Sequence, residues 1–426
     1  MRQLFRAPRG AEISCRGWQQ EATLRMSMNS VDPGVAETPE SLMPCVALGR
    51  VAADWGAFRA ICDALHDLAS NATLLVHHGQ SAGVSATSAD SPRVLIVDSD
   101  PAASWLNIGP QVFLPESYEI LAAAKRRHFN DDLAGKLIAT DGMSFAGAAL
   151  SLASIMHGAA FLGIDPDSEQ VKRYVKAGYC DVMVNNLDEA LRILKNAIRK
   201  REPASVGLSG NPAEIKQEMV SRGIVPDLLA DVGNPGEQAA NALHKLGSIL
   251  LRSAVQGAAI QETSDGATTC FVALSGEPTD NQRIDRLLLE LFAEDESLAR
   301  RLRTLQRRVR HQGLPARALW LSGQERGRLG VAVNQLLARR ELKAPIVIGL
   351  AAQSFRAIRK SVEMNAQAPR GAQLDALLRL TAGATWASIG HDAEGKARVA
   401  SAAVVADGTS EAGARIERVL TQKVSQ

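Results

Sequence analysis

Residues 137–165 hold the residue types whose spacing could do chemistry. A short apolar run leads into a turn with Gly142 and Gly147, and an Ala-rich segment and a second apolar run then end at Asp165. This order predicts a strand, a turn, a helix and a second strand. In a dinucleotide-binding βαβ unit, the glycines let backbone N–H groups approach a pyrophosphate at the helix N-terminus, and the distal acid takes ribose hydroxyls.

The glycine fingerprint of this unit is incomplete. Ser144 and Phe145 stand between the two glycines, and Ala148 follows them. A Cβ atom, and still more a phenyl ring, blocks the close approach that glycine permits. The residues alone leave two interpretations open with equal weight, a nucleotide site or an ordinary buried βαβ unit without a ligand.

The composition is ordinary for a soluble globular protein. The 426 residues suffice for two or three domains, and 46% of them are apolar and 22% charged. The net charge of +2 argues neither for nor against binding to nucleic acid. Five scattered cysteines without zinc or redox spacing predict reduced thiols in a cytosolic protein, with no metal site. Residues 142–164 lack charges, but their Ala, Ser and Gly content predicts a core segment and no membrane span.

Strand and helix patterns alternate through the middle of the chain. A helix is expected over residues 186–200, a strand over 204–208, a helix capped by Asn211 that ends before Gly223, and a strand over 225–231. This alternation predicts an α/β fold with a parallel, doubly wound sheet.

Two longer helices are expected outside that region. Residues 6–29 are predicted to form one helix, and residues 280–312 a second one with a basic outer face in its second half. No aromatic platform accompanies the basic residues, so they are interpreted as a solvated face and nucleic acid is not an expected partner.

Several collinear stretches resemble urocanase, the urocanate hydratase of histidine breakdown. They span nearly the whole chain and comprise residues 6–10, 17–22, 178–181, 210–214, 222–227, 313–317, 342–349, 383–386 and 406–409. The resemblance implies a homodimeric cytoplasmic enzyme with tightly held NAD. In that family the nicotinamide ring forms an adduct with the imidazole of urocanate, and water is then added without net hydride transfer.

The resemblance also implies a domain organisation. A Rossmann-type parallel-sheet domain is inserted between the N- and C-terminal parts of an α/β core domain. The expected boundaries are residues 1–130 for the N-terminal part, 131–260 for the Rossmann-like domain and 261–426 for the C-terminal part.

The sequence departs from the family where the chemistry is expected. Leu319 stands at the position of the family's active-site cysteine, and residues 350–354 replace an Arg-Asp-His-Leu-Asp segment with groups that cannot do acid–base work at neutral pH. Glycines are also lost from the fingerprint at residues 142–150 and from residues 45–47, and residues 231–236 replace another family motif. No catalytic residue is therefore predicted.

The resemblance leaves two sets of candidate residues. Those for cofactor contact are Gly142, Gly147, Asp165, Gly210 and Asn211. Those for a remnant of the substrate pocket are Arg317, Trp320 and His391. NAD remains the implied cofactor, although its fingerprint is degenerate.

Two functional hypotheses follow. The leading one is a pseudoenzyme, a urocanase homologue that lost the hydratase reaction and regulates or partners another protein; Phe145 and Leu150 would then fill the nucleotide space. The alternative is a repurposed NAD- or nucleotide-binding lyase or hydratase for another small imidazole-like or acidic substrate. It would need new convergent polar groups, for which His391, Asp392 and Glu394 are the clustered candidates. A working urocanate hydratase is disfavoured.

Overall fold

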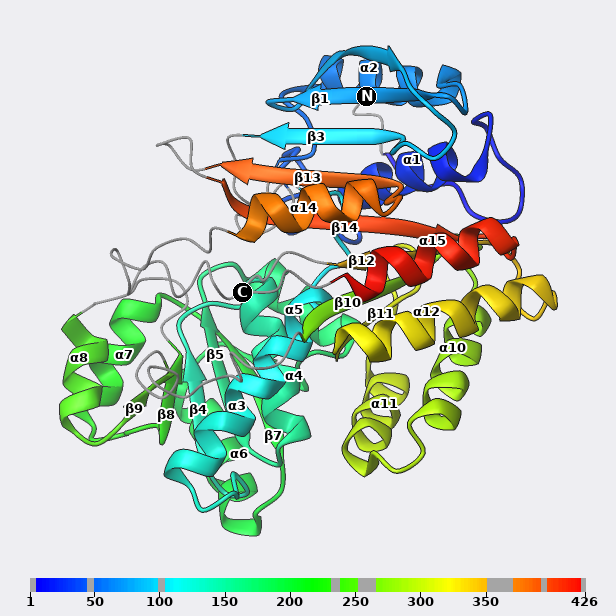
Figure 1. The fold of residues 1–426 in the computed structure, drawn as a ribbon. Coiled ribbons are helices and arrows are strands. Elements are labelled where there is room, and N and C mark those ends of the chain that lie inside the picture. The colour runs from blue at the N-terminus through cyan, green and yellow to red at the C-terminus, as the bar shows by residue number, and fades with distance from the viewer. Residues whose placement is uncertain are drawn as a thin grey trace.

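The strands form two separate sheets (Figure 1). The computed structural model describes residues 5–43, 50–98, 104–230, 238–251, 266–350, 371–391 and 397–422. Within these residues one sheet has eight strands and the other has six. The predictions for residues 45–47, 231–236 and 351–354, and for Asp392 and Glu394, lie outside the described residues.

The eight-stranded sheet is built from both ends of the chain. Its order is β11-β10-β12-β14-β13-β3-β1-β2. The N-terminal strands are β1 (Ala72–His77), β2 (Gln80–Ala86) and β3 (Val94–Asp98). The C-terminal strands are β10 (Ala267–Ala273), β11 (Ala316–Leu321), β12 (Ile346–Leu350), β13 (Trp386–His391) and β14 (Ala397–Ala406). The two sets join where β3 and β13 pair in parallel, with Val94 opposite Trp386.

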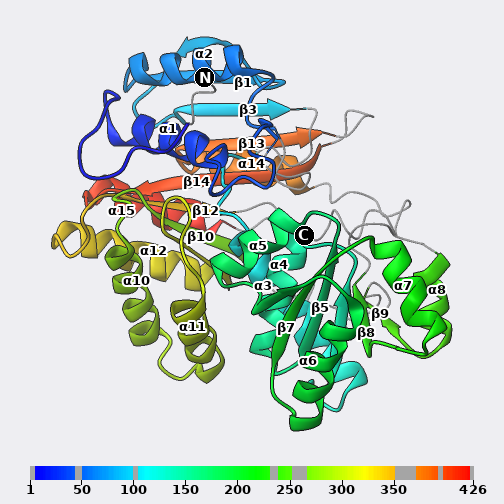
Figure 2. The same ribbon diagram turned by 180° about the vertical axis from the view of Figure 1, so that it is seen from behind.

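Helices from both ends of the chain accompany this sheet. They are α1 (Trp18–Ser30), α2 (Trp55–Asp67), α10 (Pro278–Leu291), α11 (Glu296–Arg308), α12 (Gly323–Ala338), α14 (Gly371–Thr381) and α15 (Ser410–Thr421). The view from behind in Figure 2 shows α1 and α2 beside the N-terminal strands, and α10, α11 and α12 near the C-terminal ones. A Cβ on Gly330 of α12 would lie 2.7 Å from Ile416 Cγ2 of α15, so these two helices pack closely.

The six-stranded sheet is parallel, as the alternating pattern predicted. Its order is β6-β7-β5-β4-β8-β9. The strands are β4 (Leu137–Thr140), β5 (Ala160–Asp165), β6 (Val182–Val184), β7 (Ala204–Ser209), β8 (Leu228–Ala230) and β9 (Ile249–Leu250). The helices around it are η1 (Gln111–Phe113), α3 (Leu114–His128), α4 (Phe145–Met156), α5 (Ser168–Ala177), α6 (Leu187–Lys200), α7 (Pro212–Ser221) and α8 (Gln238–Lys245).

Apolar side chains cover both faces of the six-stranded sheet. Ile138 and Phe161 face the main core, whereas Leu137 and Leu162 belong to a second apolar cluster. Neighbouring residues of a strand point to opposite faces, so continuous apolar runs such as β4 and β5 suit a sheet buried on both sides. The α/β fold with a Rossmann-like parallel sheet is thus confirmed.

Two predicted helices are wrong in their bounds. The first begins at Trp18 and not at residue 6. Gly10 has a left-handed φ of 94°, and its carbonyl accepts a hydrogen bond at 2.8 Å from Nη1 of the buried Arg25, so this part of the chain is held outside a helix. Residues 280–312 form two helices, because Phe292 ends α10 and the Asp295 side chain caps α11 by accepting from Leu298 N.

Four strands were not predicted: β2 and β10 of the eight-stranded sheet, and the short β6 and β9 of the parallel sheet. β2 is exposed along its whole length, so it lacks the apolar alternation by which a half-buried strand is recognised. β10, which pairs with both β11 and β12, was not predicted either. Among the helices of the described ranges, none is long and apolar enough to cross a bilayer.

Candidate functional site

The carboxyl edge of the six-stranded sheet brings the five predicted cofactor residues to one region. Gly142 follows β4, Asp165 ends β5 and Gly210 follows β7. Gly147 lies in the first turn of α4, and Asn211 caps α7 by accepting from Ala213 N. The backbone N–H of Gly210 donates to the carbonyl of Asp165 at 3.0 Å. Ligands of open α/β sheets bind at this edge.

The two glycines of the turn differ in what they do. A Cβ on Gly147 would lie 2.0 Å from the carbonyl oxygen of Gly142, so the helix can approach the turn only with glycine at residue 147. A Cβ on Gly142 would meet nothing within 4 Å. Ser144 caps the helix with its Oγ 3.5 Å from the N–H of Gly147. The close packing of the helix against the turn is therefore enough to explain why residue 147 is a glycine.

The carboxylate of Asp165 is bonded within the chain. Its Oδ2 accepts from Met143 N at 2.7 Å and its Oδ1 accepts from Asp167 N at 2.8 Å. Burial raises the pKa of Asp165, although these two hydrogen bonds oppose the shift. Gln170 Nε2 donates to the Met143 carbonyl at 2.9 Å, so both backbone groups of Met143 are tied to this corner.

The side chain of Met143 fills the space above the end of β5. It is fully buried, and a Cβ on Gly163 would lie 2.1 Å from its Sδ. Met143 was not predicted as a site residue, because a methionine in a turn carries no signal of what it covers.

A carboxylate from the N-terminal part reaches the N-terminus of α4. The N–H of Phe145 donates to Glu37 Oε1 at 2.7 Å. Arg173 of α5 holds the same segment, donating from Nη1 to the carbonyls of Ala36 at 2.9 Å and Glu37 at 3.3 Å. The free N–H groups and the dipole at a helix N-terminus favour an anion. Glu37 and Arg173 were not predicted, since they lie far along the chain from the turn.

A small pocket lies beside this contact, where the three parts of the chain meet. Gly34 lines it from the N-terminal part, Phe145 and Arg173 from the Rossmann-like part, and His311 from the C-terminal part, with Gln111 between them. Its cavity volume of about 30 Å³ is large enough for water molecules.

Two polar atoms at this pocket have no hydrogen-bond partner among the described residues. They are Gln111 Oε1 and His311 Nδ1. Burial, assisted by the charge of Arg317, lowers the pKa of His311 to about 4, so the imidazole is neutral at pH 7. The ring of Phe145 packs 6.3 Å from that of Phe113, whereas Leu150 is fully buried within α4.

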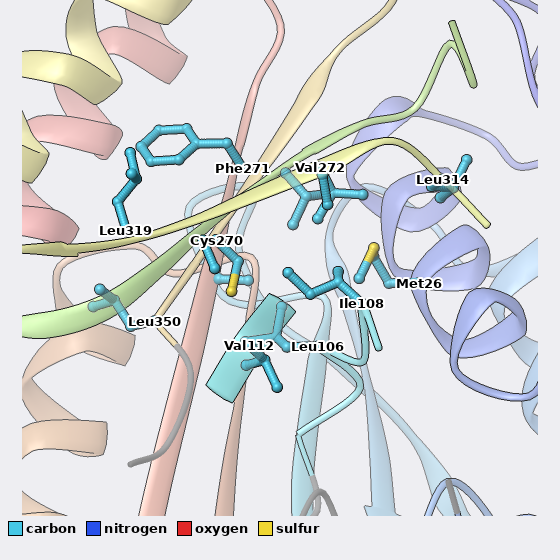
Figure 3. Close-up of a cluster of buried hydrophobic side chains, with 14 of the residues drawn as sticks. Met26, Leu106, Ile108, Val112, Cys270, Phe271, Val272, Leu314, Leu319 and Leu350 are labelled. Atoms are coloured by element: carbon cyan, nitrogen blue, oxygen red, sulfur yellow. The ribbon is translucent and has the colours of Figure 1, made fainter. Parts of the chain in front are cut away.

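Apolar side chains surround the position of the family's cysteine. Leu319 of β11 and Leu350 of β12 both lie opposite Thr269 of β10, so they share one face of the sheet. Both are 5% exposed. Figure 3 shows Leu319 directed toward the ring of Phe271, and Cys270 directed to the other side of the strands with Leu106.

The three residues proposed as a pocket remnant are not brought together. Arg317 makes a bidentate ion pair with Asp285 of α10 at 2.8 and 2.9 Å, with both side chains buried. Trp320 lies over Gly266, where a Cβ would be 2.3 Å from its Nε1. His391 ends β13, which is separated from β11 by β10, β12 and β14, or about 19 Å across the sheet. The side chain of His391 lies outside the described part.

Nucleophiles and metal ligands do not gather in the described ranges. Burial raises the pKa of the Cys15, Cys62 and Cys270 thiols to about 12 and that of Cys180 to about 11, so these four are protonated at pH 7. Nor does that part of the chain hold a group of three or more His, Cys, Asp or Glu side chains that could bind a metal ion.

The turn does not fit NAD in the arrangement described here. A pyrophosphate would need backbone N–H groups of the β4–α4 turn. Those of Met143, Phe145 and Gly147 already donate to Asp165, Glu37 and Ser144. The Met143 thioether also covers Gly163 of β5.

All three parts of the chain match domains of one known protein family. Residues 5–117 match the urocanase N-terminal domain, residues 109–235 the urocanase Rossmann-like domain, and residues 266–426 the urocanase C-terminal domain. The matches follow one another in the order of the two-sheet architecture, with the Rossmann-like match over the parallel sheet. The chain belongs to the urocanase family.

Proposed function

We propose that this chain is a non-catalytic member of the urocanase family, which keeps the fold and does not hydrate urocanate. The observation that carries the proposal is the bonding of the β4–α4 turn. Three of its N–H groups, those of Met143, Phe145 and Gly147, donate to carboxylate and hydroxyl oxygens of the chain itself, including Glu37 at 2.7 Å from Phe145 N. A cofactor would have to displace these partners and the buried Met143 before it could bind.

The surroundings of Leu319 support the same proposal. Leu319 can neither attack nor transfer a proton, and its neighbours on that face include Phe271 and Leu350. The nearest charged group along the strand, Arg317, is committed to Asp285. General acid–base groups contribute on the order of 10²–10⁴-fold to a rate, so their replacement by apolar side chains removes most of the catalysis.

The proposed role is that of a protein partner or regulator. The scaffold that remains includes the continuous eight-stranded sheet and the Rossmann-like sheet. The homodimer that the family resemblance implies would persist on this scaffold, and the cytoplasm is its proposed location.

The first test is cofactor content and activity of the purified full-length chain. We expect no NAD after heat or acid release, no calorimetric signal with millimolar NAD, and no fall in urocanate absorbance. An active urocanase assayed in parallel validates each measurement. Stoichiometric NAD together with urocanate turnover would contradict the proposal.

A repurposed nucleotide-binding enzyme is the second candidate. It is favoured by the five candidate cofactor residues, which lie together at the carboxyl edge of the Rossmann-like sheet. NAD binding without urocanate turnover would select this candidate, and small imidazole-like or acidic compounds would then be screened as substrates.

A further inference from the structure

Residues 32–37, here called the clasp, form a stiff turn after α1. Asp32 organises the turn, since its Oδ1 accepts from Gly34 N at 2.7 Å. Its carbonyl accepts from the N–H groups of Val35 and Ala36, each at 2.8 Å. The clasp is therefore a hydrogen-bonded turn that leads directly into Glu37.

The clasp is packed against the C-terminal part of the chain. A Cβ on Gly313 would lie 2.3 Å from Val35 Cγ2, and one on Gly34 would lie 3.1 Å from the carbonyl oxygen of Gln312. Just before the clasp, Asn29 Oδ1 accepts from Leu314 N at 2.8 Å. Residues 312–314 thus support the clasp from one side.

The Rossmann-like part holds the clasp from the other side. Glu37 accepts from Phe145 N at the first turn of α4, and Arg173 of α5 donates to the carbonyls of Ala36 and Glu37. Carboxylates are stabilised at helix N-termini by the same N–H groups and dipole that bind phosphates. One six-residue segment thereby joins all three parts of the molecule at the turn where a nucleotide would bind.

We propose that the clasp is a closing contact, in which Glu37 supplies from within the chain the anion that occupies the α4 N-terminus and so holds the three parts of the chain together. Its release frees the N–H of Phe145 and loosens α4 and α5 from the N-terminal part. This inference rests on the proposed function, because it gives the reason why the turn is closed to a cofactor.

Hydrogen exchange of the full-length chain tests the clasp without any ligand. Glu37→Ala should speed amide exchange about tenfold in peptides covering residues 143–150 and 168–177, the effect of losing one hydrogen bond of about 1.4 kcal/mol. Glu37→Gln should give a smaller increase, since its amide oxygen can accept from Phe145 but carries no charge. Glu40→Ala is the matched control, because Glu40 is exposed in the same loop, and it should exchange like the wild type. Equal exchange in Glu37→Ala and Glu40→Ala would overturn the proposal.

Inorganic pyrophosphate tests whether Glu37 occupies an anion-binding position at the α4 N-terminus or only forms a hydrogen bond between two parts of the chain. Millimolar pyrophosphate should slow exchange of residues 143–150 in Glu37→Ala and leave the wild type unchanged. If Glu37→Ala exchanges faster but ignores pyrophosphate, Glu37 is only a structural bond and the proposal fails.

Two controls keep this test decisive. Exchange over residues 323–338, which form α12 away from the clasp, reports whether each variant is folded, and Glu37→Gln replaces Glu37→Ala if the latter does not fold. These measurements need neither NAD nor urocanate. NAD bound to the wild type would overturn the proposed function, whereas unchanged exchange in the variants would overturn only the clasp.

Discussion

Gly142 and Gly147 are equivalent in the sequence motif but not in the structure. Only Gly147 lies against backbone, with the carbonyl oxygen of Gly142 2.0 Å from the place of a Cβ. A backbone atom cannot rotate away as a side chain can, so a methyl group there forces α4 and the turn apart. Gly147, which the motif marks as a cofactor residue, is thus needed for the packing of α4 against the turn.

Gly147→Ala should lower the free energy of unfolding by about 2–3 kcal/mol, the usual cost of forcing extra atoms into a packed site. Gly142→Ala should leave it unchanged or raise it by about 0.5 kcal/mol, because the site is open and a Cβ restricts the unfolded chain. Urea denaturation of both variants measures the difference. Equal losses in the two variants would show that the turn tolerates no side chain at either position, contrary to this account.

Single residues at the site were predictable only where the signal is local. Asp165 was recognised as an acid at a strand end, but its acceptance of the Met143 N–H was not. Glu37 could not have been found, since it contacts Phe145 across 108 residues and one sequence contains no measure of that proximity. The same holds for the bond between Arg173 and Ala36.

Elements were predictable where their ends carry their own signals. Asn211 caps α7 as expected, accepting from Ala213 N. The helix expected over residues 186–200 is α6, which Asn186 caps by accepting from Glu189 N. Residues 280–312 were predicted as one helix because apolar residues recur with helical spacing on both sides of the break at Phe292. β2 was missed because exposure on both faces leaves no alternation to detect. Tertiary contacts, and not local pattern, decide such segments.

An aromatic stack joins α3, α4 and α11. The rings of Tyr118 and His157 are 4.1 Å apart, and the Arg301 guanidinium lies 4.7 Å from the centre of the Tyr118 ring. His157 Nε2 is 3.0 Å from the carbonyl oxygen of Tyr118. Burial lowers the pKa of His157 to about 4, with the charges of Lys125 and Arg301 adding to the effect.

This depressed pKa makes stability depend on pH. Between pH 6.5 and 4 the unfolded chain binds a proton at His157 that the folded chain rejects, so the free energy of unfolding falls as the pH falls. The loss from His157 alone should be about 2 kcal/mol between pH 7 and 5. His157→Gln should reduce the pH dependence by that amount in urea denaturation at pH 7, 6 and 5. His311 adds a similar dependence, which His157→Gln leaves in place. An unchanged slope in the variant would contradict the role of His157.

At the scale of the molecule, one apolar core connects all three family regions. Leu24 of α1, Phe161 of β5 and Ile348 of β12 belong to the same buried cluster, and a smaller cluster lies on the other face of the Rossmann-like sheet. Separate domains usually have separate cores. The boundaries at residues 130 and 260 stay a prediction, and the shared cluster favours unfolding of the chain as a single cooperative unit.

Scanning calorimetry should show a single unfolding transition with equal calorimetric and van't Hoff enthalpies. Removal of the Rossmann-like region would take Phe161 away and expose the side chains of the other two parts that belong to the same cluster, so neither part is expected to unfold on its own. Wild-type protein at neutral pH is sufficient for the measurement. Two resolved transitions would mean that the shared cluster does not couple the sheets.

The pairing of β3 with β13 also sets the order of events during translation. The edge of β3 that carries Val94 can form its backbone hydrogen bonds only after Trp386 of β13, about 290 residues later, has been synthesised. At roughly 5–20 residues per second a ribosome needs about 15–60 s to make that stretch. The strands of the parallel sheet, β4 to β9, are synthesised well before then. Until then the unpaired edge of β3 can form hydrogen bonds with other chains. A chaperone that binds nascent chains would therefore matter most in the interval between synthesis of β3 and synthesis of β13.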